Sequence, residues 1–182
     1  ETIKEFENEV AKYTSELQAK KDKLAKNEQE VAQIKAKIKT IEAQMKQLIQ
    51  EAQKTIPINA WNDDFIKYLP FLLEKEQAGL DVRAHVVGDI QAPLKDLHFF
   101  VPTEEDVYLE RFQLLIVDDQ EIIFASTEGE SWQAIRTMSQ PFIKVFAEFF
   151  YHDLVLTAIM DKYDNILMED QDIKHIINRL RY

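Results

Sequence analysis

The most constraining feature of the sequence is an apolar repeat in its first fifty-odd residues, a stretch that contains neither glycine nor proline. Apolar residues recur at alternating spacings of three and four, which is the heptad spacing of a coiled coil. The stripe is narrow, whereas a helix that packs on a globular core usually presents a wider apolar face. We therefore predict a helical stalk over residues 1–56 that packs against a second seam like its own. The seam positions are Ile3, Phe6, Val10, Tyr13, Leu17, Lys20, Leu24, Asn27, Val31, Ile34, Ile38, Ile41, Met45, Leu48 and Ala52.

Charged residues beside the seam indicate which helix it meets. In a parallel, in-register pair of identical chains, each g position faces the following e position of the partner. All four such pairs join opposite charges: Glu16–Lys21, Lys23–Glu28, Glu30–Lys35 and Lys37–Glu42. This pattern favours a parallel homodimer, and a heterodimer with a sister chain or a solvated single helix are the alternatives. We expect the dimer interface at Val10, Leu17, Leu24, Asn27, Val31, Ile34, Ile38, Ile41, Met45 and Leu48.

Two seam positions, Lys20 and Asn27, are polar. Opposed asparagine side chains at a seam fix its register at some cost in stability. The alternative interpretation is a weak point that lets the stalk bend.

Charge and composition limit what the remaining residues 57–182 bind. Residues 1–55 have a net charge of +1, whereas the other 127 residues carry 11 basic and 23 acidic side chains, a net charge of −12. Such a head repels phosphate backbones, so we expect no direct nucleic-acid binding by it and a protein partner with a basic or hydrophobic surface. The chain has no cysteine and no apolar run long enough to span a membrane. Because it begins with Glu1, we expect a fragment of a longer protein or a processed one.

Periodicity predicts an α+β head, a small antiparallel sheet with flanking helices. Pro57 should end the stalk helix, and Asn62 should cap a new helix over 63–77 that Gly79 closes. The segments "LDVRAHVV" and "DLHFFV" read as strands, and "RFQLLIVDDQEIIFAS" reads as a hairpin turning at residues 118–120. The short links between these segments favour about four antiparallel strands.

The C-terminal third is expected to be mostly helical. Thr127 and Glu130 fit a capping box that would start a helix carrying Trp132, Ile135 and Met138. Residues 153–169 read as a helix, with a short hairpin turning at 164–165 as the alternative. Asp170 or Asp172 would begin a last helix that carries Ile173, Ile176, Ile177 and Leu180.

This order of elements, with "AGLDVR", "FQLLIVDDQEII" and the helix after them, resembles the RWD-type heads of coiled-coil kinetochore proteins, including the monopolin family. The resemblance implies a protein-binding head on a dimeric stalk, and a linker at kinetochores or chromosomes. The Tyr-Pro-rich turn common in the wider RWD family is missing here.

Residue patterns that carry chemistry are largely missing. His152-Asp153 is similar to the His-Asp dyad of metal-dependent phosphohydrolases, whose metal needs further His and Asp ligands from other helices. His85 and His98 fall in expected strands and cannot supply them, so a surface histidine beside a helix-terminal aspartate is the favoured interpretation. Acidic residues between Asp161 and Asp170 lack the spacing of a calcium loop. No nucleophile motif or phosphate-binding glycine loop occurs. We therefore expect no enzyme activity, catalytic residue, metal or cofactor, with a metal- or ligand-binding head as the alternative.

Aromatic residues indicate a possible function more clearly than these patterns do. "PFIKVFAEFFYHDL" gathers five aromatic side chains, which either fill the core or leave some exposed for docking. In the second case Phe146, Phe150 and Tyr151 are the candidate partner-binding residues. The sequence thus predicts a non-enzymatic scaffold, a homodimeric stalk with paired heads for protein docking, or one subunit of a heterodimeric tether.

Overall fold

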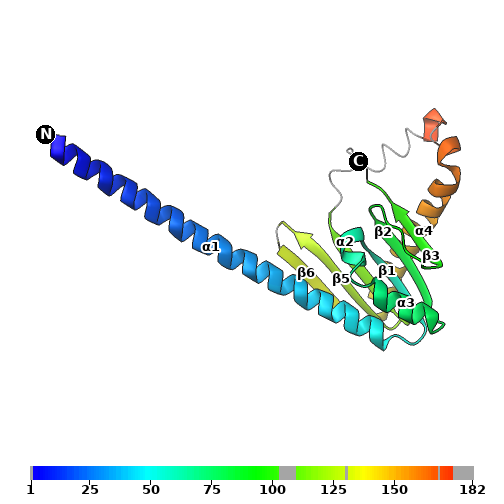
Figure 1. The fold of residues 1–182 in the computed structure, drawn as a ribbon. Coiled ribbons are helices and arrows are strands. Elements are labelled where there is room, and N and C mark those ends of the chain that lie inside the picture. Colours follow the sequence, from blue (N-terminus) through cyan, green and yellow to red (C-terminus); the bar gives the residue numbers. More distant parts are fainter. Residues whose placement is uncertain (1, 103–109, 130, 168, 174–182) are drawn as a thin grey trace. The chain divides into compact units, whose positions relative to one another are not determined.

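The computed structural model of the chain describes residues 2–102, 110–129, 131–167 and 169–173 (Figure 1). It is an α+β protein, as the sequence predicts, and it divides into two compact units, residues 1–40 and 41–182. The first unit is a single helix, and the second contains the sheet with its covering helices.

Helix α1 spans Thr2–Glu51 without interruption. The long N-terminal helix expected from the sequence is therefore confirmed. It ends just before Ala52, whose N–H bonds to the carbonyl oxygen of Ile49 at 3.3 Å, and the chain then enters a strand.

The sheet has six strands in the order β3-β2-β1-β4-β5-β6. Strands β1 (Thr55–Trp61), β2 (Asp81–Val87) and β3 (Asp96–Phe100) are parallel, and β4 (Phe112–Val117), β5 (Glu121–Glu128) and β6 (Ser131–Thr137) continue antiparallel. The expected antiparallel sheet of about four strands is thus wrong, because β1 and β6 were not foreseen. Strand β1 provides the parallel partner that a crossover requires.

The crossover from β1 to β2 is built from two short helices, α2 (Asn62–Phe65) and α3 (Leu69–Gln77), where one continuous helix was expected. Pro70 lies in the first turn of α3, where its missing N–H removes no helical hydrogen bond. Gly79 follows α3 with a φ of 95°, as expected for a helix end.

The predicted β4–β5 hairpin is confirmed. Asp118 and Asp119 both have positive φ, near 55°, and the N–H of Gln120 bonds to the carbonyl oxygen of Val117. Asparagine and aspartate tolerate this left-handed backbone better than other non-glycine residues. The helix expected after Thr127 is wrong, because Glu128 pairs with Ser131 across a second hairpin in which Gly129 has a φ of 60°.

Helix α4 spans Gln140–Leu167, so the helix expected over residues 153–169 is confirmed as far as Leu167, in preference to the alternative hairpin. Pro141 lies in its first turn, where its missing N–H removes no helical hydrogen bond. Asp170 begins the next helical turn, because its Oδ1 accepts hydrogen bonds from the backbone N–H groups of Asp172 and Ile173. The rest of that expected helix, with Ile176, Ile177 and Leu180, lies outside the described residues.

Helix α4 covers one face of the sheet, and the end of α1 with α2 and α3 lies on the other (Figure 1). The core below α4 contains the buried residues Leu114, Ile116, Ile122, Ile143 and Phe150. On the opposite face Tyr68 is buried and donates a hydrogen bond to Gln113 Oε1 at 2.6 Å.

Candidate functional site

The most exposed apolar surface of the first unit is the predicted seam of α1. Its exposed fraction falls from 77% at Ile3 to 48% at Val31, and the apolar seam residues between them are exposed by more than half of their surface. The polar seam residues Lys20 and Asn27 are exposed as well. Ile34 and Ile38 are half-buried. A soluble protein seldom leaves so long an apolar stripe uncovered, so this stripe is a candidate interaction surface.

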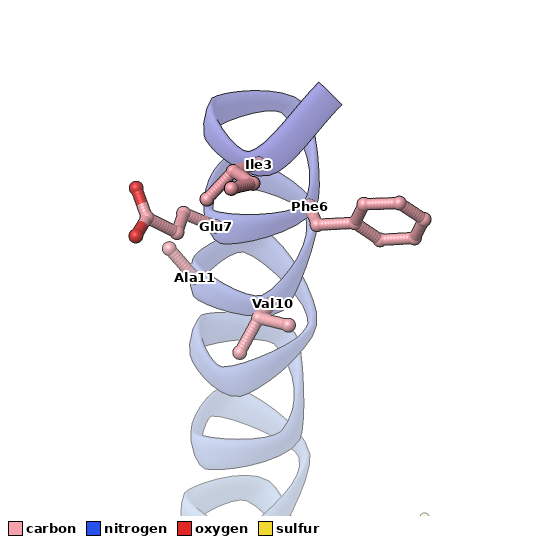
Figure 2. A pocket seen from close by; sticks show the side chains of 5 residues that line it. All are labelled: Ile3, Phe6, Glu7, Val10 and Ala11. Carbon is pink, nitrogen blue, oxygen red and sulfur yellow. The ribbon is translucent and has the colours of Figure 1, made fainter. Parts of the chain in front are cut away.

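Figure 2 shows the first turns of this stripe, with the side chains of Ile3, Phe6, Glu7 and Val10 projecting from one helix around a shallow hollow. In heptad terms these residues occupy positions a, d, e and the next a. Four residues so placed form the hole that receives a d-position side chain of a parallel partner helix. Four of the five residues that line the hollow, all except Ala11, therefore have the positions of one coiled-coil layer.

The lower part of the expected seam lies in the core of the second unit. Ile41, Met45 and Leu48 are at most 5% exposed, so their assignment to the dimer interface is wrong. Ile49 and Ala52 are buried beside them, and together they widen the stripe into the face of a helix that packs on a sheet. The sequence signal for this change was Ile49, which directly follows Leu48 and lies off the heptad seam.

The fourth predicted charge pair, Lys37–Glu42, has one member that is engaged within its own chain. Glu42 forms an ion pair with Lys67, and Lys67 Nζ lies 3.0 Å from Asp64 Oδ1. Glu42 is thus engaged within the second unit. Of the other three pairs, Glu30 also lies 3.9 Å from Lys26 of its own helix, in an exposed contact that a partner helix can replace.

A network of charged groups extends from this ion pair to β4. Arg111 donates two hydrogen bonds to Asp64 Oδ2, at 2.7 and 3.0 Å, and one to Asp63 Oδ1 at 2.5 Å. Burial raises the pKa of Asp63, but its hydrogen bond and charge interaction with Arg111 outweigh this effect, so the pKa lies below its ordinary value. Because the side chain of Asp64 is only 4% exposed, the network holds α2 on the sheet rather than offering an open site.

The aromatic candidates on α4 divide between core and surface. Phe150 is fully buried, so its proposed docking role is wrong, and the helical repeat turns it toward the sheet. Phe146 and Tyr151 are half-buried and pack against the same core cluster. Phe149, 44% exposed, is the neighbouring aromatic residue that faces outward.

Phe149 and Phe146 also border a shallow aromatic hollow beside β4 and β5. Its lining residues are Glu110, Phe112, Phe124, Ser126, Phe146 and Phe149. The ring centroids of Phe124 and Phe146 are 4.9 Å apart, and those of Phe112 and Phe149 are 6.2 Å apart. These contacts attach the first turns of α4 to the sheet.

Buried polar groups lie between α4 and the parallel strands. Asn59 and His85 are neighbours across β1 and β2, and His85 Nε2 lies 2.9 Å from Thr157 Oγ1 on α4. Burial lowers the pKa of His85 to about 4, and the neighbouring His98 acts in the same direction. Burial raises the pKa of Asp153, an effect partly opposed by His152. These groups belong to the contact between α4 and the sheet.

Among the side chains that the structure describes, the residues singled out in the sequence assemble no metal site. His152 is exposed, whereas Asp153 is half-buried and accepts a long 3.5 Å hydrogen bond from Asn59. Within the described residues, no group of three or more His, Cys, Asp or Glu side chains is placed to hold a metal ion. The side chains of Asp164 and Asn165 lie outside the described part of the chain. None of the described helices is long and apolar enough to cross a membrane.

Comparison with known proteins finds structures with a similar fold but identifies no family for this chain. Neither a protein-family model nor a curated protein matches the chain. Among solved structures, TrmBL2, an archaeal chromatin protein with a novel mode of DNA binding, is 14% identical with a TM-score of 0.50. The match covers 63% of this chain and 48% of the TrmBL2 chain, so this chain spans about half of that protein.

Two further structures are more distant. NucT from Helicobacter pylori is 9% identical over 65% of this chain and 89% of its own, with a TM-score of 0.42. Nuc from Salmonella typhimurium, a phospholipase D family member, is 12% identical over 61% of this chain and 84% of its own, with a TM-score of 0.40. None of the three is a kinetochore or RWD protein, and the RWD resemblance stays a prediction.

Proposed function

We propose that the chain is a non-enzymatic, homodimeric scaffold. In this proposal, two copies pair in parallel along residues 3–38, and each presents an acidic head for docking to a protein partner. One observation carries the proposal: the seam is exposed up to Val31, whereas Ile41 and Met45 farther along the same helix are buried by the sheet.

The free energy of apolar burial supports the pairing. Transfer of a Val, Leu, Ile or Phe side chain from water to a packed interior contributes about 1.5–3 kcal/mol. Val10, Leu17, Leu24 and Val31 each retain about half or more of their surface in the single chain. A partner helix that covers them gains this free energy, whereas a solvated single helix does not.

The hollow in Figure 2 would receive a side chain of a partner helix in either orientation, so the choice of a parallel orientation is supported by charge. Glu16–Lys21, Lys23–Glu28 and Glu30–Lys35 join opposite charges between parallel copies. Each exposed pair contributes only a few tenths of a kcal/mol, so their effect is on register and orientation.

The pairing of two heads on one stalk would allow the scaffold to bind a partner bivalently. A partner that carries two binding sites meets the second head at a high effective concentration, which raises avidity without any new contact. The head's net charge of −12 favours partners with basic or hydrophobic surfaces and disfavours direct contact with DNA. A linker at kinetochores or chromosomes, as the RWD resemblance implies, is a narrower form of the same proposal.

A heterodimeric tether is the second candidate, and Lys20 favours it. In a parallel homodimer the two Lys20 ammonium groups face each other at the seam, a like-charge contact that a sister chain with an acidic residue would relieve.

Light scattering on the purified chain tests the proposal. The wild type should be a dimer, and Leu17→Asp with Leu24→Asp should shift it strongly toward monomer, because buried charges would face their copies. The matched control is Ala19→Asp with Ala25→Asp, which adds the same charge to the same turns away from the seam and should stay dimeric. A monomeric wild type would reject the homodimer and favour the tether.

A further inference from the structure

Helix α4 carries a second apolar seam along its solvent-exposed side, and one edge residue of this seam, Phe149, also contacts Phe112 of the sheet. Val145 is 67% exposed and Leu156 60% exposed, and both retain this surface in the described part of the chain. The seam residues follow heptad spacing over more than five helical turns. We define the α4 seam as Val145, Phe149, His152, Leu156, Ile159 and Tyr163.

The sheet-facing residues of α4 lie on the opposite side of the helix. Ile143, Phe150 and Thr157 recur every seven residues, and each is buried. The α4 seam is therefore a surface additional to the hydrophobic core, and a helix laid on it would not displace the sheet.

We propose that the α4 seam binds the α4 seam of a second copy of this chain, in antiparallel orientation. In that arrangement Val145 faces Tyr163 of the second copy, Phe149 faces Ile159, and His152 faces Leu156, and each contact occurs twice about a twofold axis. Such a surface is self-complementary, as an isologous interface must be.

Flanking residues distinguish the antiparallel from the parallel orientation. Antiparallel pairing sets Glu148 beside Lys162 of the second copy, again twice, and brings the two Val155 side chains together at the twofold axis. All three residues are exposed. Parallel pairing would instead separate Glu148 from Lys162. Asp153 meets an acidic group in either orientation, Glu148 in the parallel case and Asp153 of the second copy in the antiparallel case, so the Glu148–Lys162 pair is what favours the antiparallel orientation.

The contact adds a head-to-head interaction to the stalk of the proposed function and does not depend on it. If the stalk pairs two copies, their heads meet at a high effective concentration and a short α4 contact suffices. If the stalk does not pair, two α4 seams are still complementary in the same antiparallel register and can still bind each other.

Single cysteines provide the test, because the natural chain contains none. In the full chain, Val155→Cys should react with its own copy through a short bis-maleimide to give a covalent dimer. Lys162→Cys is the matched control at an equivalent position two turns away. Antiparallel copies of residue 162 would lie about 20 Å apart along the helix axis, beyond the linker. A mixture of Glu148→Cys and Lys162→Cys chains should give the mixed dimer.

Charge exchange in the Val155→Cys background gives a second readout. Glu148→Lys alone and Lys162→Glu alone should each lower the cross-linking yield several-fold, and the double exchange should restore it. Circular dichroism confirms that each variant is folded. Equal yields for Val155→Cys and Lys162→Cys would overturn the proposal, as would a double exchange that fails to restore cross-linking. No cross-linking of Val155→Cys would show that the seam is free or is covered by something other than a second α4.

Discussion

The backbone N–H of Lys54 donates a 2.6 Å hydrogen bond to the carboxylate of Asp118. The same carboxylate accepts from the N–H groups of Gln53 and Thr55, both at 2.9 Å. One side chain in the β4–β5 turn thus secures the last two residues of the link between α1 and β1 and the first residue of β1. Burial raises the pKa of Asp118, but these backbone hydrogen bonds outweigh burial, so the pKa lies below its ordinary value.

Substitution of Asp118 should measurably weaken the connection between α1 and β1. Asp118→Asn tolerates the positive φ and keeps one acceptor oxygen, so we expect a loss of about 1 kcal/mol in unfolding free energy. Asp118→Ala loses all three acceptor contacts and is strained at a φ of 55°, so we expect about 2–3 kcal/mol. Urea denaturation at pH 7 measures both. Equal losses for the two variants would contradict the role given to the carboxylate.

Removal of Arg111 should cost far more than removal of Arg83, because the two arginines are equally exposed but only Arg111 pairs with a buried carboxylate. Arg111→Ala leaves the buried carboxylate of Asp64 with Lys67 as its remaining ion-pair partner, and the expected loss is about 3 kcal/mol. Arg83→Ala breaks a surface pair with Asp81 and should cost about 1 kcal/mol or less. Thermal or urea unfolding of the two variants compares them directly, and similar losses would show that Asp64 is better solvated than its burial indicates.

Two adjacent phenylalanines should behave very differently. Phe150→Ala opens a cavity in the core below α4 and should destabilise the head by about 3–5 kcal/mol. Phe149→Ala removes a ring that is 44% exposed and should cost about 1 kcal/mol. A reversal of this order in chemical denaturation would show that α4 is rotated from the orientation described.

Acidification should weaken the fold through His85. The folded pKa is lowered to about 4 from an ordinary 6.5, so the unfolded state takes up the proton first. The stabilisation is present above pH 6.5 and is lost as the pH falls toward 4, a decrease of about 3 kcal/mol in unfolding free energy. His85→Gln should remove this part of the pH dependence, whereas His152→Gln, which alters an exposed histidine, should retain it.

Asp153 acts in the opposite direction, because its raised pKa favours the protonated folded state at low pH. The comparison of His85→Gln with the wild type isolates His85, because Asp153 is present in both proteins. An unchanged pH profile in His85→Gln would contradict the assignment.

The periodicity of the sequence predicted those helices and strands whose local residue pattern matches the way they pack in the fold. The long helix, β2, β3 and the β4–β5 hairpin follow from heptad spacing, alternation and a turn with two aspartates. Strand β1 escaped prediction because proline is rare in a central strand. Pro57 is accepted because pairing with β4 begins only at Ile58, so its missing N–H faces no ladder partner on that side.

Other features depended on tertiary contacts that the sequence does not display. The capping-box pattern at Thr127 and Glu130 was outweighed by pairing of β6 with β5 around Gly129. The change of α1 from seam to core helix near Ile41 follows from the position of the sheet, although Ile49 widens the stripe there. The sheet also determines which aromatic residues of α4 are exposed, because it covers one face of that helix.

Oxidative cross-linking of single cysteines in the stalk tests the central claim most directly. In a parallel, in-register pair, Val10→Cys and Val31→Cys should each form a disulfide with its own copy. A mixture of the two variants should give no 10–31 dimer, because those positions lie about 30 Å apart along the helix. Self-linked dimers at both positions are the predicted result. Preferential 10–31 dimers, or none at either position, would contradict a parallel homodimeric stalk.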